Sequence, residues 1–210
     1  MPLPIHDLPL FLLAGMLLNL TPGPDMLFVI GNGAAHGRRA GVMASLGIGA
    51  GCVLHMLLAA VGLSALLAAS ALAFEVVKWV GAAYLVWVGI GMLRRGAAPG
   101  RAPPPVPPRK VFWQGALTNA LNPKVALFFL AFLPQFITPG RSGEAAAFLL
   151  LGALFNVGGT AINVIVALLA SGLRERLAGR ATGGRIGGWL QRAAGALFVG
   201  LGLKLALTTR

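Results

Sequence analysis

The chain has 210 residues, of which 57% are hydrophobic and only 10% are charged. Soluble domains carry about 25% charged residues, so this composition excludes an ordinary soluble protein and indicates an integral membrane protein. The formal net charge is +12, but the basic residues stand in short segments between apolar runs, which is typical of cytoplasmic loops at a membrane surface and argues against a nucleic-acid partner.

The predicted secondary structure is entirely helical. Several apolar segments reach the length of about 20 residues that a helix needs to cross a bilayer. We therefore predict a single all-α integral membrane domain over residues 1–210, with about six transmembrane helices. The predicted spans are 8–35, 41–69, 72–93, 111–137, 145–170 and 189–207.

The first span is interrupted by the sequence Thr21, Pro22, Gly23, Pro24 and Asp25. Proline removes a backbone hydrogen bond from a helix, and a charge at the bilayer centre costs about 2.5–3.5 kcal/mol on the insertion scale. Broken backbone at this depth is tolerated only where protein buries it or where it lines a wet cavity. The sequence therefore predicts a helix that is broken here, with Thr21 as the N-cap of its second half.

The second span is rich in glycine and alanine. Gly47 and Gly51 are four residues apart, a spacing that permits close contact between helices. Cys52 is the only cysteine, which rules out an intramolecular disulfide and favours a packing role. His55 lies mid-span, and two roles are open for it: a proton relay, or a neutral ring bonded to a neighbouring backbone group, which is favoured.

A proline-rich loop over residues 94–110 precedes the fourth span, which contains a second break at Asn122, Pro123 and Lys124. Asn122 is a good N-cap residue, and Pro123 suits the first position of a helix. Breaks at corresponding places in two halves of a membrane protein point to the binding site of a transporter.

The fifth span carries Asn156, Thr160 and Asn163, whose spacing places them on one helix face. Two interpretations stay open: these side chains bind substrate, or they form hydrogen bonds between helices. The same alternatives apply to Asn19, Thr118 and Asn119.

The order of the spans predicts two inverted repeats, at about 8–93 and 111–207. Each repeat holds three spans, so the second repeat enters the membrane from the side opposite to the first. The loops after the first, third and fifth spans hold most of the basic residues. The positive-inside rule places these loops in the cytoplasm and both termini outside.

The two breaks predict a binding site. Each break is expected to begin a half-helix whose free N–H groups and positive dipole end attract an anionic group. Asp25 then lies where the dipole favours a carboxylate, whereas Lys124 lies where it disfavours an ammonium. We therefore expect these two side chains to pair with each other in the absence of substrate and to bind the ammonium and carboxylate of a zwitterionic amino acid. The alternative is a purely structural ion pair.

The candidate substrate-binding residues are Thr21, Pro22, Gly23, Pro24, Asp25, Asn122, Pro123, Lys124, Asn156 and Asn163. Asp25 and His55 are the candidates for proton coupling.

Five motifs stand in order along the chain: Asn19–Asp25, Gly37–Gly41, Gly47–Gly49, Asn119–Lys124 and Phe132–Phe136. Together they resemble the LysE/RhtB family of amino-acid exporters, and the resemblance covers essentially the whole chain. It implies a bacterial inner-membrane exporter of amino acids or their derivatives, driven by the proton motive force, and does not fix the substrate.

Other functions fit the sequence less well than amino-acid export. An exporter of metal cations requires clusters of histidine and carboxylate side chains, which the sequence lacks. A membrane-embedded enzyme requires a nucleophile or metal constellation, and none is present, so we expect no catalytic activity, no cofactor and no bound metal. Two alternatives stay open: export of another small solute, and a structural, non-transporting role. The structural role does not explain why the charges of Asp25 and Lys124, which are costly within a membrane, are present. The expected partners are an amino acid and the lipid bilayer, and homo-oligomerisation stays open.

Overall fold

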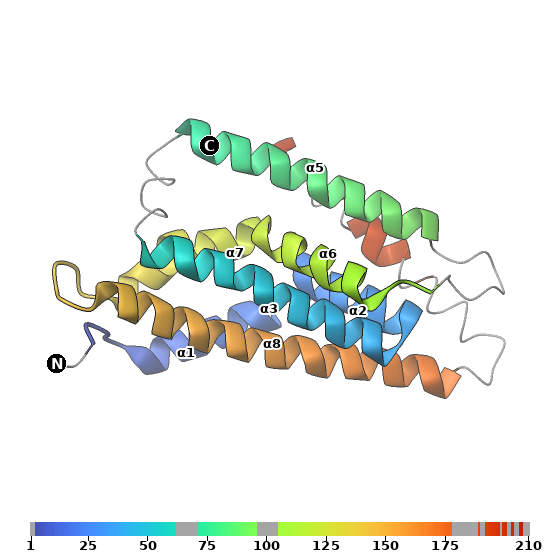
Figure 1. Cartoon of the computed structure of the whole chain (residues 1–210), viewed down its shortest axis with the longest axis horizontal. Coiled ribbons are helices and arrows are strands. Elements are labelled where there is room, and N and C mark those ends of the chain that lie inside the picture. Colours follow the sequence, from blue (N-terminus) through green and yellow to red (C-terminus); the bar gives the residue numbers. More distant parts are fainter. Residues whose placement is uncertain are drawn as a thin grey trace.

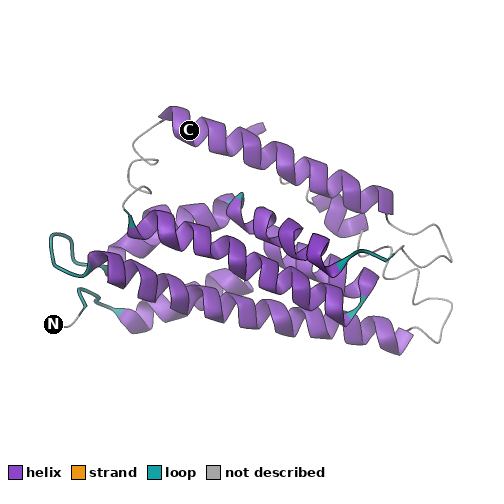
Figure 2. Cartoon of the chain, in the orientation of Figure 1, coloured by secondary structure: helices purple, strands orange, loops and turns teal. Residues whose placement is uncertain are grey.

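The computed structural model of the chain describes residues 3–61, 71–95 and 105–177, together with 189, 192–197, 199–200, 203 and 206–207. The described residues are helical except for short connections, as Figure 2 shows, and they contain one isolated β-bridge, between Ile5 and Ile137. The prediction of an all-α membrane protein is confirmed.

Both predicted helix breaks are present. The first and second helices meet at an angle of 49°, and the second break bends its span by 45°. The elements are α1 (Leu8–Leu20), α2 (Pro24–His36), α3 (Arg38–Ala60), α5 (Ala71–Arg95), α6 (Pro108–Ala120), α7 (Pro123–Leu127), a π-helical turn (Phe128–Phe132), a 3-10 turn (Leu133–Phe136) and α8 (Glu144–Leu177).

The helices correspond to the predicted spans in order. Within the described residues, α3 and the Glu144–Arg176 part of α8 are long and apolar enough to cross a membrane, and counting each bent pair as one span brings the number to four. The 25-residue helix α5 occupies the third predicted span. The predicted sixth span, 189–207, lies largely outside the described residues.

The two broken helices run in opposite directions along the molecule. In Figure 1, α1 and α2 run from the end that holds the N-terminus to the other end, whereas α6 and α7 run back toward it. This antiparallel relation agrees with the predicted inverted repeat. It also brings the two breaks to the middle of the same bundle.

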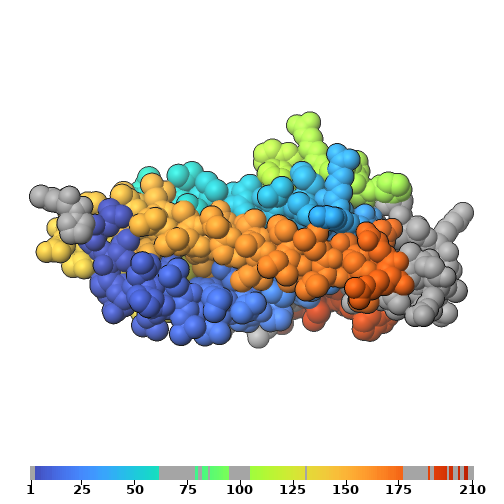
Figure 3. Space-filling view, turned by 90° about the horizontal axis from the view of Figure 1, so that it is seen from below, coloured from blue at the N-terminus to red at the C-terminus, as the bar shows by residue number. Residues whose placement is uncertain are grey.

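Helix α8 holds the first broken span and α3 together. It contacts α1, α2 and α3, and Figure 3 shows it as an orange ridge between the blue α1 and α2 and the lighter blue α3. Helix α3 in turn packs on α6 with its opposite face. The bundle thus joins elements of both predicted repeats around the breaks.

Glycines allow α3 and α6 to touch through their backbones. A Cβ atom added at Gly47 would lie 2.1 Å from the carbonyl oxygen of Phe112, and one added at Gly51 would lie 2.2 Å from that of Ala116. Real Cβ atoms do not approach backbone so closely, so the two helices would have to separate. The predicted role of this glycine pair in close helix contact is confirmed.

We expect Gly51→Ala to lower the free energy of unfolding by about 1–3 kcal/mol, the usual cost of overpacking. Gly158→Ala is the matched control, because a Cβ at Gly158 on α8 has nothing within 4 Å and alanine favours a helix over glycine by about 0.5–1 kcal/mol. Thermal unfolding of the two purified variants in detergent tests this. Equal midpoints would show that the contact between α3 and α6 is looser than the structure has it.

Two apolar cores lie at the two ends of the bundle. The first is aromatic and joins α1, α3, α8 and the residues after the second break. The second joins α2, α3, α5 and α6. Both breaks fall between them, because Phe11 and Phe128 belong to the first core and Phe28 and Val111 to the second. The polar residues of the breaks are therefore enclosed by apolar layers at both ends.

Candidate transport site between the two helix breaks

Two prolines fix the position of the first break. A residue that precedes proline is pushed out of the α-helical region. Thr21 precedes Pro22 and has φ −69° and ψ 119°, and Gly23 precedes Pro24 and has φ −160° and ψ −172°. The chain therefore stays extended until Pro24 starts α2, and Asp25 falls in the first turn of that helix.

The prediction that Thr21 caps the second half-helix is wrong. Thr21 instead ends α1, where its hydroxyl donates to the carbonyl oxygen of Leu17 at 2.8 Å. Gly23 occupies the N-cap position of α2 and offers no side chain for capping. The second proline of the motif is the reason, since it keeps Gly23 extended and delays the helix by two residues.

The second break follows the prediction. The Asn122 side-chain oxygen accepts a hydrogen bond from the backbone N–H of Lys124 at 3.0 Å, and Pro123 is the first residue of α7. This is the N-cap geometry that satisfies one of the free N–H groups at a helix start. Asn122 is buried, with 1% of its surface exposed.

Lys124 crosses from the second break to the first. Its ammonium donates to the carbonyl oxygens of Leu18 and Thr21, each at 2.8 Å. These carbonyls belong to the end of α1, where the last C=O groups lack helical partners and the helix dipole is negative. The C-terminal end of α1 therefore compensates the lysine charge.

Asp25 makes the reciprocal contact, from α2 to α6. Its carboxylate accepts a hydrogen bond from the Asn119 amide at 2.8 Å. The expected direct pair between Asp25 and Lys124 is not formed, because the Lys124 ammonium donates to the end of α1 instead. Each charge has found a closer polar partner in the opposite broken span, so two separate contacts tie the breaks together.

Three buried polar atoms at the breaks have no hydrogen-bond partner. Within the described residues, the buried side-chain atoms without a partner are Oδ1 of Asp25, Oδ1 of Asn119 and Nδ2 of Asn122. An unsatisfied buried polar group costs about 1–3 kcal/mol. All three belong to the breaks, so two acceptors and one donor are left without a partner there.

His55 lies next to this site on α3. Its Nε2 donates to the backbone carbonyl of Asn119 at 3.0 Å, and its ring stacks on Phe129 with the centroids 5.9 Å apart. The expected hydrogen bond to neighbouring backbone is present, and a role of His55 in proton coupling stays a prediction. Asn119 thus links His55 through its backbone and Asp25 through its side chain. The sequence alone leaves the role of Asn119 open, and its place three residues before Asn122 is the signal that points to the break.

Polar side chains on α8 take part in hydrogen bonds at its contacts with neighbouring helices. Asn156 donates from Nδ2 to the carbonyl oxygen of Gly49 on α3 at 3.1 Å, and Thr160 donates to the Asn156 side-chain oxygen at 3.3 Å. Asn19 on α1 similarly donates to the carbonyl oxygen of Phe155 at 3.2 Å. Asn163 is buried on the same helix. Substrate binding by Asn156 and Asn163 stays a prediction.

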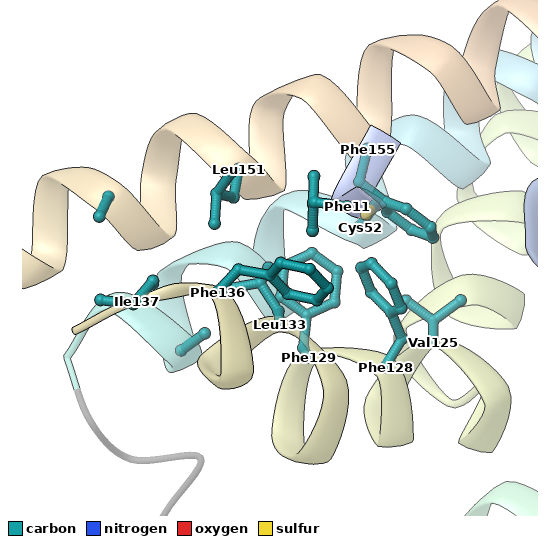
Figure 4. Close-up of a cluster of buried hydrophobic side chains, with 12 residues drawn as sticks. Phe11, Cys52, Val125, Phe128, Phe129, Leu133, Phe136, Ile137, Leu151 and Phe155 are labelled. Carbon is teal, nitrogen blue, oxygen red and sulfur yellow. The ribbon is translucent and has the colours of Figure 1, made fainter. Parts of the chain in front are cut away.

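Aromatic side chains close the site toward the end of the bundle that holds the N-terminus. Figure 4 shows the rings of Phe11, Phe128, Phe129 and Phe136 pointing toward one another below α8, which adds Phe155. The rings of Phe128 and Phe155 stack with their centroids 4.1 Å apart. Within the described residues, no group of three histidine, cysteine or acidic side chains is placed to hold a metal.

Comparisons with known proteins agree with this architecture. The sequence matches the family model of the LysE type translocators over residues 16–209. It is 34% identical to an uncharacterized membrane protein of Pseudomonas aeruginosa, over 98% of this chain and 97% of that protein. It is also 34% identical to the homoserine/homoserine lactone efflux protein of Salmonella typhimurium, over 93% of this chain and 94% of that protein.

A further relative is the leucine efflux protein of Enterobacter sp. (strain 638), which is 32% identical over 67% of this chain and 68% of that protein. No solved structure matches the chain. The family match extends over both helix breaks and nearly the whole length. The chain therefore belongs to the LysE type translocator family, and it is a membrane translocator rather than an enzyme.

Proposed function

We propose that this protein exports an amino acid or an amino-acid derivative across the bacterial inner membrane, as a proton-coupled antiporter. The observation that carries the proposal is the set of three unpartnered polar atoms, on Asp25, Asn119 and Asn122, between two apolar cores. Two relatives named for the efflux of homoserine or its lactone and for the efflux of leucine support the substrate class.

The chemistry of the three atoms suits an amino acid. An ammonium group supplies the donors that Oδ1 of Asp25 and Oδ1 of Asn119 lack, and a carboxylate or carbonyl oxygen accepts from Nδ2 of Asn122. The negative charge of Asp25 makes the first of these contacts charge-assisted and therefore the strongest. In this proposal Lys124 holds the end of α1 in place and does not bind the substrate carboxylate, which revises its expected role.

Proton coupling is proposed for Asp25, with His55 as its neighbour. A carboxylate that gives up a bound ammonium is left with an unsatisfied charge, and a proton from the outside restores neutrality. Asn119 bonds to both Asp25 and His55, so it connects the two candidates. Export from proteoliposomes that is indifferent to an imposed pH gradient, at constant membrane potential, would remove proton coupling from the proposal.

The proposed function is tested by export from intact cells. Cells that overproduce the protein are loaded with dipeptides containing L-leucine or L-homoserine, and the free amino acids inside and outside are measured over time. We expect a lower internal pool and faster appearance outside than in vector controls, together with growth at otherwise toxic dipeptide concentrations. If a broad panel of amino acids shows no difference while the protein is confirmed in the membrane, amino-acid export is the wrong function.

We further propose that the basic end of the bundle faces the cytoplasm and that both termini lie outside. In Figure 1 the start of α3, the end of α5 and the start of α6 lie at one end of the molecule, with Arg38, Arg94 and Arg109 in these segments. A periplasm-specific reporter fused after Arg210 is expected to be active, and so is a cytoplasm-specific reporter inserted within residues 97–108. The opposite pattern would reverse the orientation.

A further inference from the structure

A pocket opens at the basic end of the bundle, away from the aromatic core. Its volume is about 260 Å³, and residues of α2, α5 and α6 line it. The polar lining comes from Asn32, His36, Arg94 and Gln114. Pockets for drug-sized molecules begin at about 300 Å³, so this one has the size for a smaller solute such as a single amino acid.

The lining combines a cation with several apolar side chains. Phe28, Trp87 and Met92 line the pocket together with Arg94. A guanidinium binds a carboxylate through charge-assisted hydrogen bonds, and aromatic and thioether groups contact an aliphatic side chain favourably. The pocket therefore suits a small molecule with a carboxylate at one end and an apolar or weakly polar group at the other.

The pocket and the first helix break lie on one face of α2. On α2, Asp25 is followed by Phe28, Asn32 and His36 at steps of three, four and four residues, which places them on one face. The last three line the pocket. From Asp25 to His36 this face is roughly 16 Å long, at 1.5 Å per residue. One helix face thus leads from the basic end to the unpartnered carboxylate oxygen.

Helix α6 also reaches from the pocket to the breaks. Gln114 lines the pocket, and Asn119 is five residues further along the same helix, on a different face, and contacts Asp25. Each of the two helices therefore has residues in the pocket and residues at a helix break. Beyond the breaks, the way to the opposite end is filled by the aromatic core.

We propose that this pocket is the entry site for the exported amino acid, which binds here before it reaches the helix breaks. Arg94 binds the carboxylate, Asn32 and Gln114 contact polar groups, and the apolar side chain lies against Trp87 and Phe28. The proposal rests on the proposed export function and adds a second, separate binding site to it. In this arrangement the protein is ready to take up substrate at the basic end while the aromatic core keeps the other end closed.

The test uses Trp87 as a reporter of pocket binding. The chain has four tryptophans, and Trp79→Phe, Trp113→Phe and Trp189→Phe leave Trp87 as the single fluorophore in the purified full-length protein. Titration with L-leucine and L-homoserine is expected to change its emission in a saturable way with the amino acid that cells export. The response should persist in an Asp25→Asn background, because that side chain lies at the breaks and not in the pocket.

Arg94→Gln supplies the second measurement, with Arg109→Gln as its matched control. Arg109 is an exposed arginine on α6 that does not line the pocket. We expect Arg94→Gln to raise the half-saturating concentration about three- to tenfold, in both Trp87 titration and export, with the maximal export rate unchanged. Arg109→Gln should leave both values unchanged.

The proposal is overturned if Trp87 emission does not respond to an amino acid that wild-type cells export, or if Arg94→Gln binds that amino acid as tightly as Arg109→Gln does. Absence of export by the wild type is a different result. It contradicts the proposed function itself, and the entry site falls with it.

Discussion

Asp25→Asn is expected to abolish export while the protein still folds and reaches the membrane. Asparagine has the shape of aspartate, and its side-chain oxygen can accept the hydrogen bond that Asn119 donates at 2.8 Å. The contact between α2 and α6 therefore survives. The unpartnered Oδ1 atom and the negative charge are lost, and with them the proposed partner of the substrate ammonium.

The expected size of the effect follows from the charge. A hydrogen bond to a charged group contributes about 1.5–3 kcal/mol, which corresponds to binding weaker by about 10- to 150-fold. If Asp25 also carries the coupling proton, export falls to the background rate at every substrate concentration. Initial export rates over a range of internal concentrations separate the two cases, because weaker binding alone is overcome at high concentration.

Asp7→Asn is the matched control, since it removes the same charge from an exposed aspartate outside the helix breaks. Asp7 bonds to His6 near the N-terminus, and its replacement should leave export unchanged. Thermal unfolding in detergent should give wild-type midpoints for both variants. Full export by a well-folded Asp25→Asn protein would show that the carboxylate is structural, and the search for the substrate site would move to the polar residues of α8.

The helix breaks were predictable from the sequence because proline acts locally. Pro22, Pro24 and Pro123 constrain the residues before them whatever the rest of the fold does, and the structure has a break at each motif. The cap of the second break was predictable for the same reason. The cap of the first was not, because the N-cap preference of Thr21 competes with the extended conformation that Pro24 imposes on Gly23.

The partners of the two charges were not predictable in the same way. Opposite charges in two matching motifs favour an ion pair, which is the hypothesis that the sequence supports. Lys124 instead reaches the carbonyls at the end of α1. This contact depends on how the two broken spans are placed relative to each other, and that placement depends on packing with α3, α6 and α8. Likewise, the pocket at the basic end joins residues of three helices, and single-helix patterns do not reveal it.

Lys124→Met is expected to destabilise the protein by about 1.5–3 kcal/mol, the usual contribution of a hydrogen bond to a charged group. Methionine keeps much of the apolar stem, which lies over Gly23 with Cδ 3.7 Å and Cε 3.9 Å from a Cβ built there. It cannot donate to the carbonyls of Leu18 and Thr21. The end of α1 then loses its fixed position relative to the second break, so export should also fall.

Lys110→Met is the control for the loss of a lysine, because Lys110 is exposed in the first turn of α6. The double variant Asp25→Asn, Lys124→Met tests whether the two charges make separate contacts or pair directly with each other. Because the charges have different partners, we expect the double variant to be destabilised about as much as Lys124→Met alone, with a coupling energy below about 1 kcal/mol. Residues that share one salt bridge show coupling of up to about 3 kcal/mol, so a value near that limit would mean that Asp25 and Lys124 pair directly, as the sequence alone predicts.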